Sequence, residues 1–133
     1  MIEKIGVDSS ERTQFIDITD RIKQLVYKSG IAEGCCTVYV PHTTAAVTIN
    51  ECADPSVKRD ILKVLERLIP YKGDYQHLEG NSDAHTKASL VGSSVRLIID
   101  AGDIVLGRWQ GVFFCEFDGP RSRKVIVQIV RAT

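Results

Sequence analysis

Two apolar segments near the C-terminus constrain the fold of this chain more than any other feature. Residues 112–117 and 125–130 are apolar at nearly every position, without the strict alternation of a strand that has one wet face. Such segments are typical of strands whose two faces are both covered. Helices would cover one face of the sheet, and a partner subunit is a candidate for the other. Turn-forming residues separate the segments: Asp118, Gly119, Pro120, Arg121 and Ser122. We therefore predict a β-hairpin with a loop of about five residues.

The clearest helix begins after Asp54, which is a good N-cap, and at Pro55, which suits the first helical position. Pro70 ends it. Between these residues the apolar side chains recur at helical spacing and form one stripe: Val57, Ile61, Val64, Leu65 and Leu68. This pattern predicts an amphipathic helix that packs on the core through that stripe.

The rest of the chain contains further predicted helices and strands. A helix capped by Thr19 is predicted to end at Gly30, and a shorter one capped by Ser82 is predicted to end near Val91. Residues 71–81 lack periodicity and are predicted to form a loop. β-Branched, aromatic or alternating content predicts further strands at residues 13–18, 36–40, 45–49, 95–99 and 104–106. No linker or repeat divides the sequence, so we expect one α+β domain over residues 1–133.

Composition narrows the functional class. Basic and acidic residues both number 17, so the net charge is zero, and the basic residues are scattered. A nucleic-acid partner is therefore not expected. No segment has the length of a membrane span or the pattern of a secretory signal. The four cysteines form neither a redox motif nor a disulfide framework. We expect a cytoplasmic protein with a small-molecule partner.

The three histidines, His42, His77 and His85, all lie next to polar residues and near the ends of predicted elements. His85 falls in the first turn of its helix, where the helix dipole disfavours the charged ring. Neutral imidazoles suit Zn²⁺ and similar metals, and three of them leave a position open for water or substrate. Their spacing matches no established ligand motif, so solvated or hydrogen-bonded loop histidines remain the alternative.

Two other polar groups and the single tryptophan each have both a chemical and a structural interpretation. Glu51 could act as a general base, whereas the neighbouring Asp54 suits a capping role. Asp118, Arg121 and Arg123 cluster at the predicted hairpin loop, where arginines could bind phosphate or simply be solvated. Trp109 could form a ligand wall or ordinary packing.

Together these motifs resemble the YjbQ family. The resemblance covers the chain from about Phe15 to the C-terminus. Each motif is weak alone, but five in order are specific. Cys52 stands where many relatives have an asparagine. The motifs are Pro41-His42-Thr43-Thr44-Ala45-Ala46; Asn50-Glu51 with Asp54-Pro55; His77 with Gly80-Asn81-Ser82 and Ala84-His85; Leu106-Gly107 with Trp109-Gln110; and Asp118-Gly119-Pro120-Arg121 with Arg123.

The resemblance implies a compact α+β fold with a mixed or antiparallel sheet and about three helices, assembling as a homotrimer. It also implies that the three histidines gather in a pocket that holds a divalent metal, with Zn²⁺ the ion that imidazoles favour. Glu51 and Arg121 would lie close to this pocket. With Asp118 they are the candidate catalytic residues.

The resemblance further implies a secondary thiamine-phosphate synthase activity, which joins a pyrimidine diphosphate to a thiazole phosphate and releases pyrophosphate. Departure of a diphosphate usually needs Mg²⁺, which prefers oxygen ligands to imidazoles. The synthase is thus the function that can be named, and the physiological reaction is expected to differ. Two alternatives stay open: a metal-dependent hydrolase with Glu51 as base, and a non-catalytic protein that binds a small anion.

Overall fold

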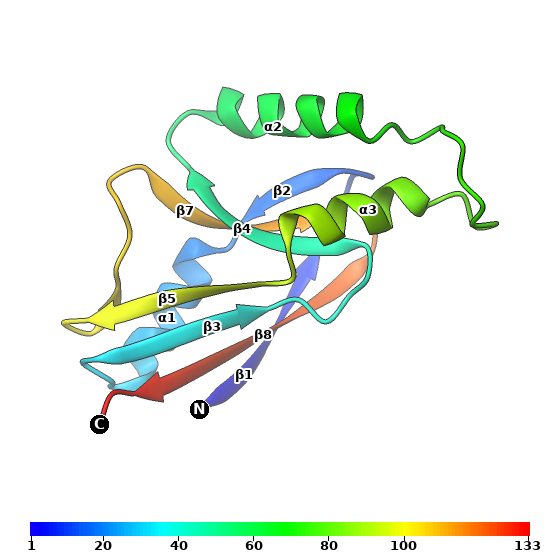
Figure 1. Cartoon of the computed structure of the whole chain (residues 1–133). Coiled ribbons are helices and arrows are strands. Elements are labelled where there is room, and N and C mark those ends of the chain that lie inside the picture. Colours follow the sequence, from blue (N-terminus) through cyan, green and yellow to red (C-terminus); the bar gives the residue numbers. More distant parts are fainter.

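The computed structural model describes all of residues 1–133, which form eight strands and three helices (Figure 1). All strand pairs are antiparallel. The elements are β1 (Ile2–Asp8), β2 (Gln14–Asp17), α1 (Thr19–Ser29), β3 (Gly34–Tyr39), β4 (Ala45–Glu51), α2 (Pro55–Leu68), α3 (Ser82–Val91), β5 (Ser94–Asp100), β6 (Asp103–Ile104), β7 (Gln110–Glu116) and β8 (Ser122–Arg131). The predicted α+β class with three helices is confirmed, and both sheets are purely antiparallel.

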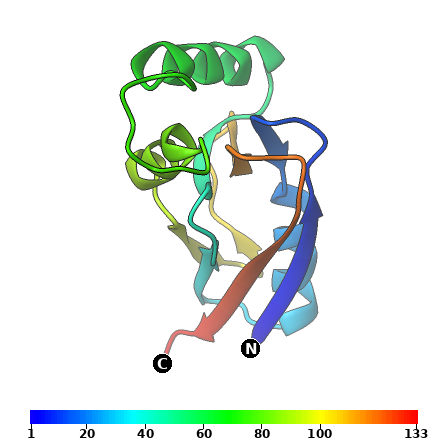
Figure 2. The same ribbon diagram turned by 90° about the vertical axis from the view of Figure 1, so that its right-hand side faces the viewer.

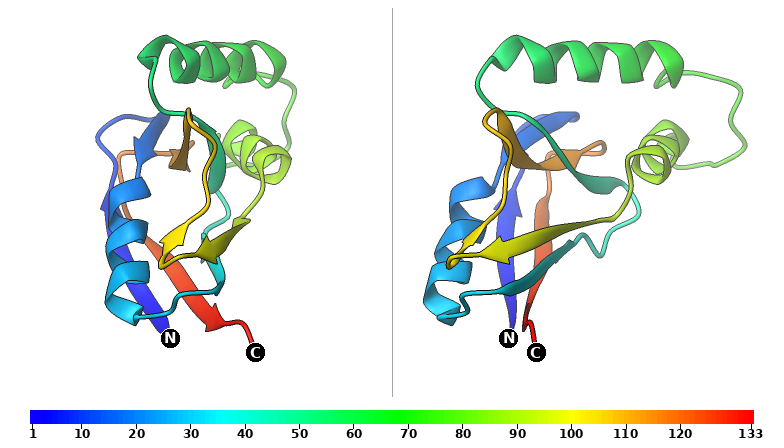
Figure 3. Two further views of the ribbon diagram at one scale, coloured as in Figure 1. Left: turned by 90° about the vertical axis from the view of Figure 1, so that its left-hand side faces the viewer. Right: turned by 60° about the vertical axis from the view of Figure 1, so that its left-hand side comes forward.

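Two sheets form the framework. The larger has the strand order β1-β8-β3-β5-β6, and the smaller has the order β2-β7-β4. Helix α1 packs along one side, while α2 and α3 lie near the smaller sheet, with α2 at the far end of the molecule (Figures 2 and 3). The two chain termini lie close together at the opposite end. None of the helices combines the length and apolar character needed to cross a membrane.

Strand β7 explains why residues 112–117 are apolar on both faces. Val112 and Phe114 point into the main core, a cluster of 18 buried residues that lies between the two sheets and α1. Phe113 and Cys115 point the other way, into a second cluster of 8 buried residues that α2 and α3 help to cover. The prediction of two covered faces is therefore confirmed for this strand, and helices of the same chain provide the second cover.

The predicted hairpin between residues 112–117 and 125–130 is wrong. Strand β7 is the centre of the smaller sheet, whereas β8 pairs with β1 and β3 in the larger one. Backbone groups of the connection bond to distant segments instead of to each other: Phe117 N donates to Thr44 O, and Gly119 N donates to Arg12 O. These contacts direct the two strands into different sheets. Strand β8 accordingly alternates, with buried and more exposed side chains in turn.

One further prediction from the sequence needs correction, and one strand was missed. Helix α2 and its cap are confirmed, because the Asp54 carboxylate accepts from Ser56 N at 2.9 Å. Its apolar stripe, however, is buried only at Leu65, and Leu68 is 66% exposed. Strand β1 was not predicted at all, since residues 1–10 mix charged and apolar side chains. Residues 2–8 form a strand because they pair along their whole length with β8, although their own sequence pattern does not indicate one.

Candidate functional site

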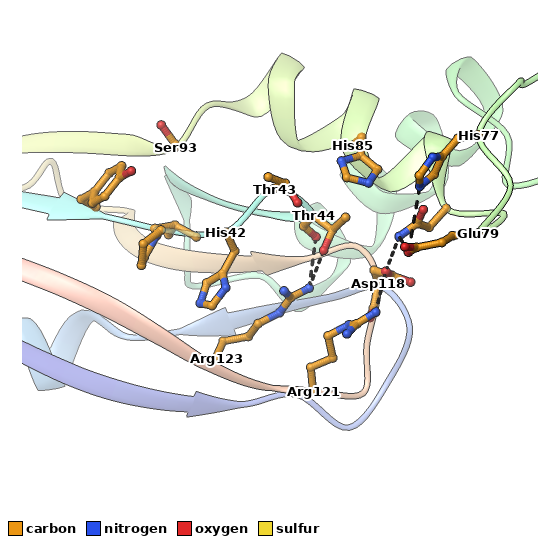
Figure 4. A pocket seen from close by; sticks show the side chains of 14 residues that line it. His42, Thr43, Thr44, His77, Glu79, His85, Ser93, Asp118, Arg121 and Arg123 are labelled. Atoms are coloured by element: carbon orange, nitrogen blue, oxygen red, sulfur yellow. Dashed lines mark hydrogen bonds and ion pairs between the residues drawn. The ribbon is translucent and has the colours of Figure 1, made fainter.

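A polar pocket of about 760 Å³ lies where β3, the β7–β8 connection and the N-terminal end of α3 meet (Figure 4). All three histidines line it, together with Asp118, Arg121 and Arg123. Its volume suits a small-molecule ligand. Only two of its 14 lining residues are hydrophobic. The full lining consists of Tyr39, Val40, Pro41, His42, Thr43, Thr44, His77, Glu79, Asn81, His85, Ser93, Asp118, Arg121 and Arg123.

His42 occupies the wall of this pocket that faces β8. Strand β3 ends before Pro41, but β8 continues beyond it, so Lys124 has no strand partner on that side. The imidazole fills the gap: Lys124 N donates to His42 Nε2 at 3.0 Å. Partial burial and the nearby charge of Arg123 lower the pKa of His42. The ring is therefore neutral near pH 7.

Arg123 and Glu116 form a buried ion pair beneath the pocket. Arg123 Nε donates to Glu116 Oε1 at 2.9 Å, and Nη2 donates to Glu116 Oε2 and to Thr44 Oγ1. Ser9 Oγ also donates to this carboxylate, at 2.6 Å. Burial opposes ionisation of Glu116, but these bonds and the backbone N–H of Asp118 outweigh it and lower the pKa.

The guanidinium of Arg123 has donors to spare. None of its hydrogen bonds uses Nη1. This atom is not among the buried atoms without a partner, so solvent reaches it although the side chain is only 6% exposed. Arg123 lines the pocket, and its Nη1 carries two N–H donors that no group of the chain accepts.

The opposite wall contains the other two histidines. The rings of His77 and His85 meet edge to face, with 5.4 Å between their centroids. Asp118 joins this wall to the pocket rim: its Oδ2 accepts from Asn81 Nδ2 at 2.9 Å and from Arg121 Nη2 at 3.0 Å. Figure 4 shows His42 and Arg123 on one side and His77 and His85 on the other. The pocket thus has His42 on one side and His77 with His85 on the other.

A buried ion network that the sequence did not reveal fixes α3, the helix that carries His85. Arg12 makes a bidentate contact with Asp83, at 3.0 Å for both bonds. Lys87 donates to Asp83 at 3.0 Å and to Glu66 of α2 at 2.6 Å. Burial opposes ionisation of Asp83, yet the bonds from Arg12 and Lys87 lower its pKa. The only available signal was the i, i+4 spacing of Asp83 and Lys87.

Glu51 does not lie in this pocket. It is the last residue of β4 and pairs with Gln110, whereas His42 precedes the first residue of that strand. Cys52 lies near Gly111, and Cys52 N donates to Trp109 O at 2.8 Å. The expected proximity of Glu51 to the histidines is therefore absent within one chain, because β4 is extended and separates them by its full length.

The three histidines do not form a metal-ligand set as they stand. No group of three or more His, Cys, Asp or Glu side chains is positioned to hold a metal. His42 Nε2 is engaged by Lys124 N, and the carboxylate of Asp118 is engaged by Arg121 and Asn81. Neither a three-imidazole site nor a carboxylate site for Mg²⁺ is thus preformed.

Fold and pocket together define a small α+β protein with one polar pocket lined by histidines and arginines. The chain belongs to the YjbQ family: the family model described as "UPF0047 protein YjbQ-like" matches residues 3–132. The chain is 51% identical over 130 residues to UPF0047 protein MJ1081 of Methanocaldococcus jannaschii, covering 98% of this chain and 94% of that protein. It is 41% identical over 131 residues to UPF0047 protein YugU of Bacillus subtilis, covering 98% and 99%.

Solved structures agree with this assignment. An uncharacterised conserved protein of the YjbQ/UPF0047 family from Clostridium acetobutylicum has a TM-score of 0.95 and 54% identity, covering 96% of this chain and 99% of that one. A protein of unknown function from Sulfolobus solfataricus has a TM-score of 0.96 at 32% identity, covering 99% and 97%. The names of these relatives state no activity, so function must be argued from the pocket.

Proposed function

We propose that this pocket is the active site of an enzyme that acts on a small phosphorylated substrate. The observation that carries the proposal is the Arg123 guanidinium, which is buried, is held by Glu116, lines the pocket, and has no hydrogen bond at Nη1. A positive group that is fixed in position loses little conformational entropy when it binds a phosphate. Arg121, at the rim, adds a second and more exposed donor.

The reaction we propose is of the thiamine-phosphate synthase type, as the family resemblance implies. In it, the bond between the pyrimidine methylene carbon and the diphosphate oxygen breaks. The thiazole nitrogen then bonds to that carbon, and pyrophosphate leaves. Arg123 and Arg121 would stabilise the charge that develops on the leaving oxygens. His77 and His85 would position the second reactant. Both reactants are anionic, which agrees with the polar lining of the pocket.

The direct test supplies both phosphorylated reactants and Mg²⁺ and measures thiamine phosphate by fluorescence after oxidation. We expect turnover by the wild-type protein, and a loss of about tenfold or more in kcat/KM for Arg121→Met. Arg59→Met is the matched control, because Arg59 is an exposed arginine on α2 outside the pocket. Absence of product with well-folded wild-type protein would exclude this reaction.

A non-catalytic anion-binding protein is the second candidate, and the same Arg123 geometry favours it. This candidate predicts a different outcome in the assay. Phosphate compounds would bind, and Arg121→Met would lower their affinity, but no reactant pair would be converted. The metal-dependent hydrolase has less support, because Glu51 lies outside the pocket and His42 Nε2 is already hydrogen-bonded.

The outer face of the larger sheet supports the expected homotrimer, which we retain as a proposal. Register places Val130, Cys35 and Ile98 in one row across β8, β3 and β5, and Ile126 beside Tyr39 in another. Ile98 is 66% exposed and Val130 47% exposed, which is unusual for apolar side chains that share one sheet face. A second copy of the chain is an occupant with matching character.

Light scattering during gel filtration tests this proposal. We expect a mass of three chains of 14.8 kDa each for the wild type, and a smaller mass for Ile98→Lys. Lys63→Glu, an exposed change on α2, is the control and should leave the mass unchanged. A wild-type protein that elutes as a single chain at micromolar concentration would contradict the trimer.

A further inference from the structure

The contacts between His42 and β8 bear on which ring nitrogen carries the proton. Lys124 N lies 3.0 Å from His42 Nε2, and Lys124 O lies 3.2 Å from the same atom. The backbone N–H can only donate, so it bonds to Nε2 only when Nε2 presents its lone pair. A proton on Nε2 would instead donate to Lys124 O and leave Lys124 N–H without this acceptor. The shorter contact is the one with Lys124 N, which favours the neutral ring that carries its proton on Nδ1.

The Nδ1–H group faces open space. It has no hydrogen-bond partner in the chain, and it is not among the buried atoms without a partner, so solvent reaches it. His42 lines the polar pocket together with Arg123. The two side chains are held between the same two segments, because His42 bonds to Lys124 while Arg123 bonds to Thr44. Figure 4 shows them next to each other at the pocket wall.

We infer that His42 Nδ1–H and Arg123 Nη1 form one anion site, which binds a phosphoryl oxygen of the substrate through a neutral donor and a charged donor. This inference rests on the proposed function and specifies the phosphate subsite within it. The Arg123 guanidinium is ion-paired with Glu116, so the site selects its ligand by the directions of its donors as well as by charge.

The arrangement gives His42 a role different from that of a metal ligand or a general base. A metal at Nε2 would displace the bond from Lys124 N, and a metal at Nδ1 would require the proton to move to Nε2. With the proton on Nδ1, that nitrogen has no lone pair with which to abstract a proton. His42 is therefore a hydrogen-bond donor to substrate.

Nitrogen-15 NMR of histidine-labelled protein tests the inference, with inorganic phosphate as the probe. The chain has three histidines, and the signals lost in His42→Ala identify His42. In the free protein we expect the proton on Nδ1 of His42. Phosphate should shift this Nδ1–H resonance, and Lys124→Ala should keep the tautomer because it retains the backbone N–H. A proton on Nε2 in the free protein would overturn the inference.

Binding measurements provide the second arm. By calorimetry, His42→Ala should lower the affinity for inorganic phosphate about tenfold. His42→Asn should lower this affinity less, because the asparagine amide places a donor near the position of Nδ1. Equal affinities of wild type and His42→Ala would contradict the anion site. If phosphate binds and shifts the His42 resonance but the enzyme assay gives no product, the proposed reaction fails and the anion site stands. If phosphate binds without moving His42, the inference alone fails.

Discussion

Replacing Glu116 with alanine is expected to lower the free energy of unfolding by about 3–5 kcal/mol. The carboxylate is fully buried and neutralises Arg123, so its removal leaves a buried guanidinium without its anion. Ser9 Oγ and Asp118 N lose their acceptor as well. Urea unfolding followed by circular dichroism measures the change, with the protomer concentration held constant because assembly would also affect the midpoint.

The matched control removes both charges. The double variant Glu116→Ala with Arg123→Met leaves no isolated ion, and we expect it to regain more than half of the stability that Glu116→Ala loses. It should also fail to bind phosphate, since the charged donor is gone. If the double variant is no more stable than Glu116→Ala, the cost comes from packing and not from the unpaired charge.

Acidification below about pH 4 is expected to lower the free energy of unfolding progressively. Glu116 and Asp83 both have pKa values lowered in the folded protein by the basic side chains bonded to them. As the pH falls, the unfolded carboxylates take up protons first, so protons favour unfolding. The stabilisation is complete above the ordinary pKa and is lost as the pH falls through the folded pKa, at about 1.4 kcal/mol for each unit of depression.

Comparing two proteins at two pH values isolates this effect. Urea midpoints are measured at about pH 7 and about pH 3.5 for the wild type and for Glu116→Gln with Arg123→Met, which lacks one of the two titrating networks. We expect a smaller acid-induced loss in the double variant. Equal losses in both proteins would show that Glu116 does not contribute to the acid sensitivity.

Local sequence patterns predicted those elements whose signals are local. Helix α2 begins at Pro55 after the Asp54 cap, because both the cap and the fixed φ of proline act within one turn. The apolar character of residues 112–117 predicted two covered faces, since burial requires apolar side chains whichever element provides the cover. These features depend on residues that are close together in the chain.

The pairing of β7 and β8 could not be predicted in this way. A turn between two apolar segments favours a hairpin, but Thr44 and Arg12 bond to the connection from far away in the sequence. Their effect appears only once the sheets have formed. The same holds for β1, which forms a strand by pairing with β8, a segment far away in the sequence.

The candidate site also combines features that the local sequence indicated with features that depend on contacts between distant elements. Polar surroundings singled out His42, His77 and His85, and the structure places all three around one pocket. The sequence did not reveal that Glu116 holds Arg123, or that Asp83 and Lys87 fix α3, because these ion pairs join separate elements. It also misplaced Glu51, since nothing in the local pattern shows that β4 carries it away from the histidines.

A crystal structure grown with inorganic pyrophosphate tests most directly whether the pocket binds a phosphate through Arg123 and His42. We predict an anion whose oxygens lie within hydrogen-bond distance of Arg123 Nη1 and His42 Nδ1, with Lys124 N still bonded to Nε2. An anion bound away from both side chains, or an imidazole turned so that Nε2 ligates a metal, would contradict the account.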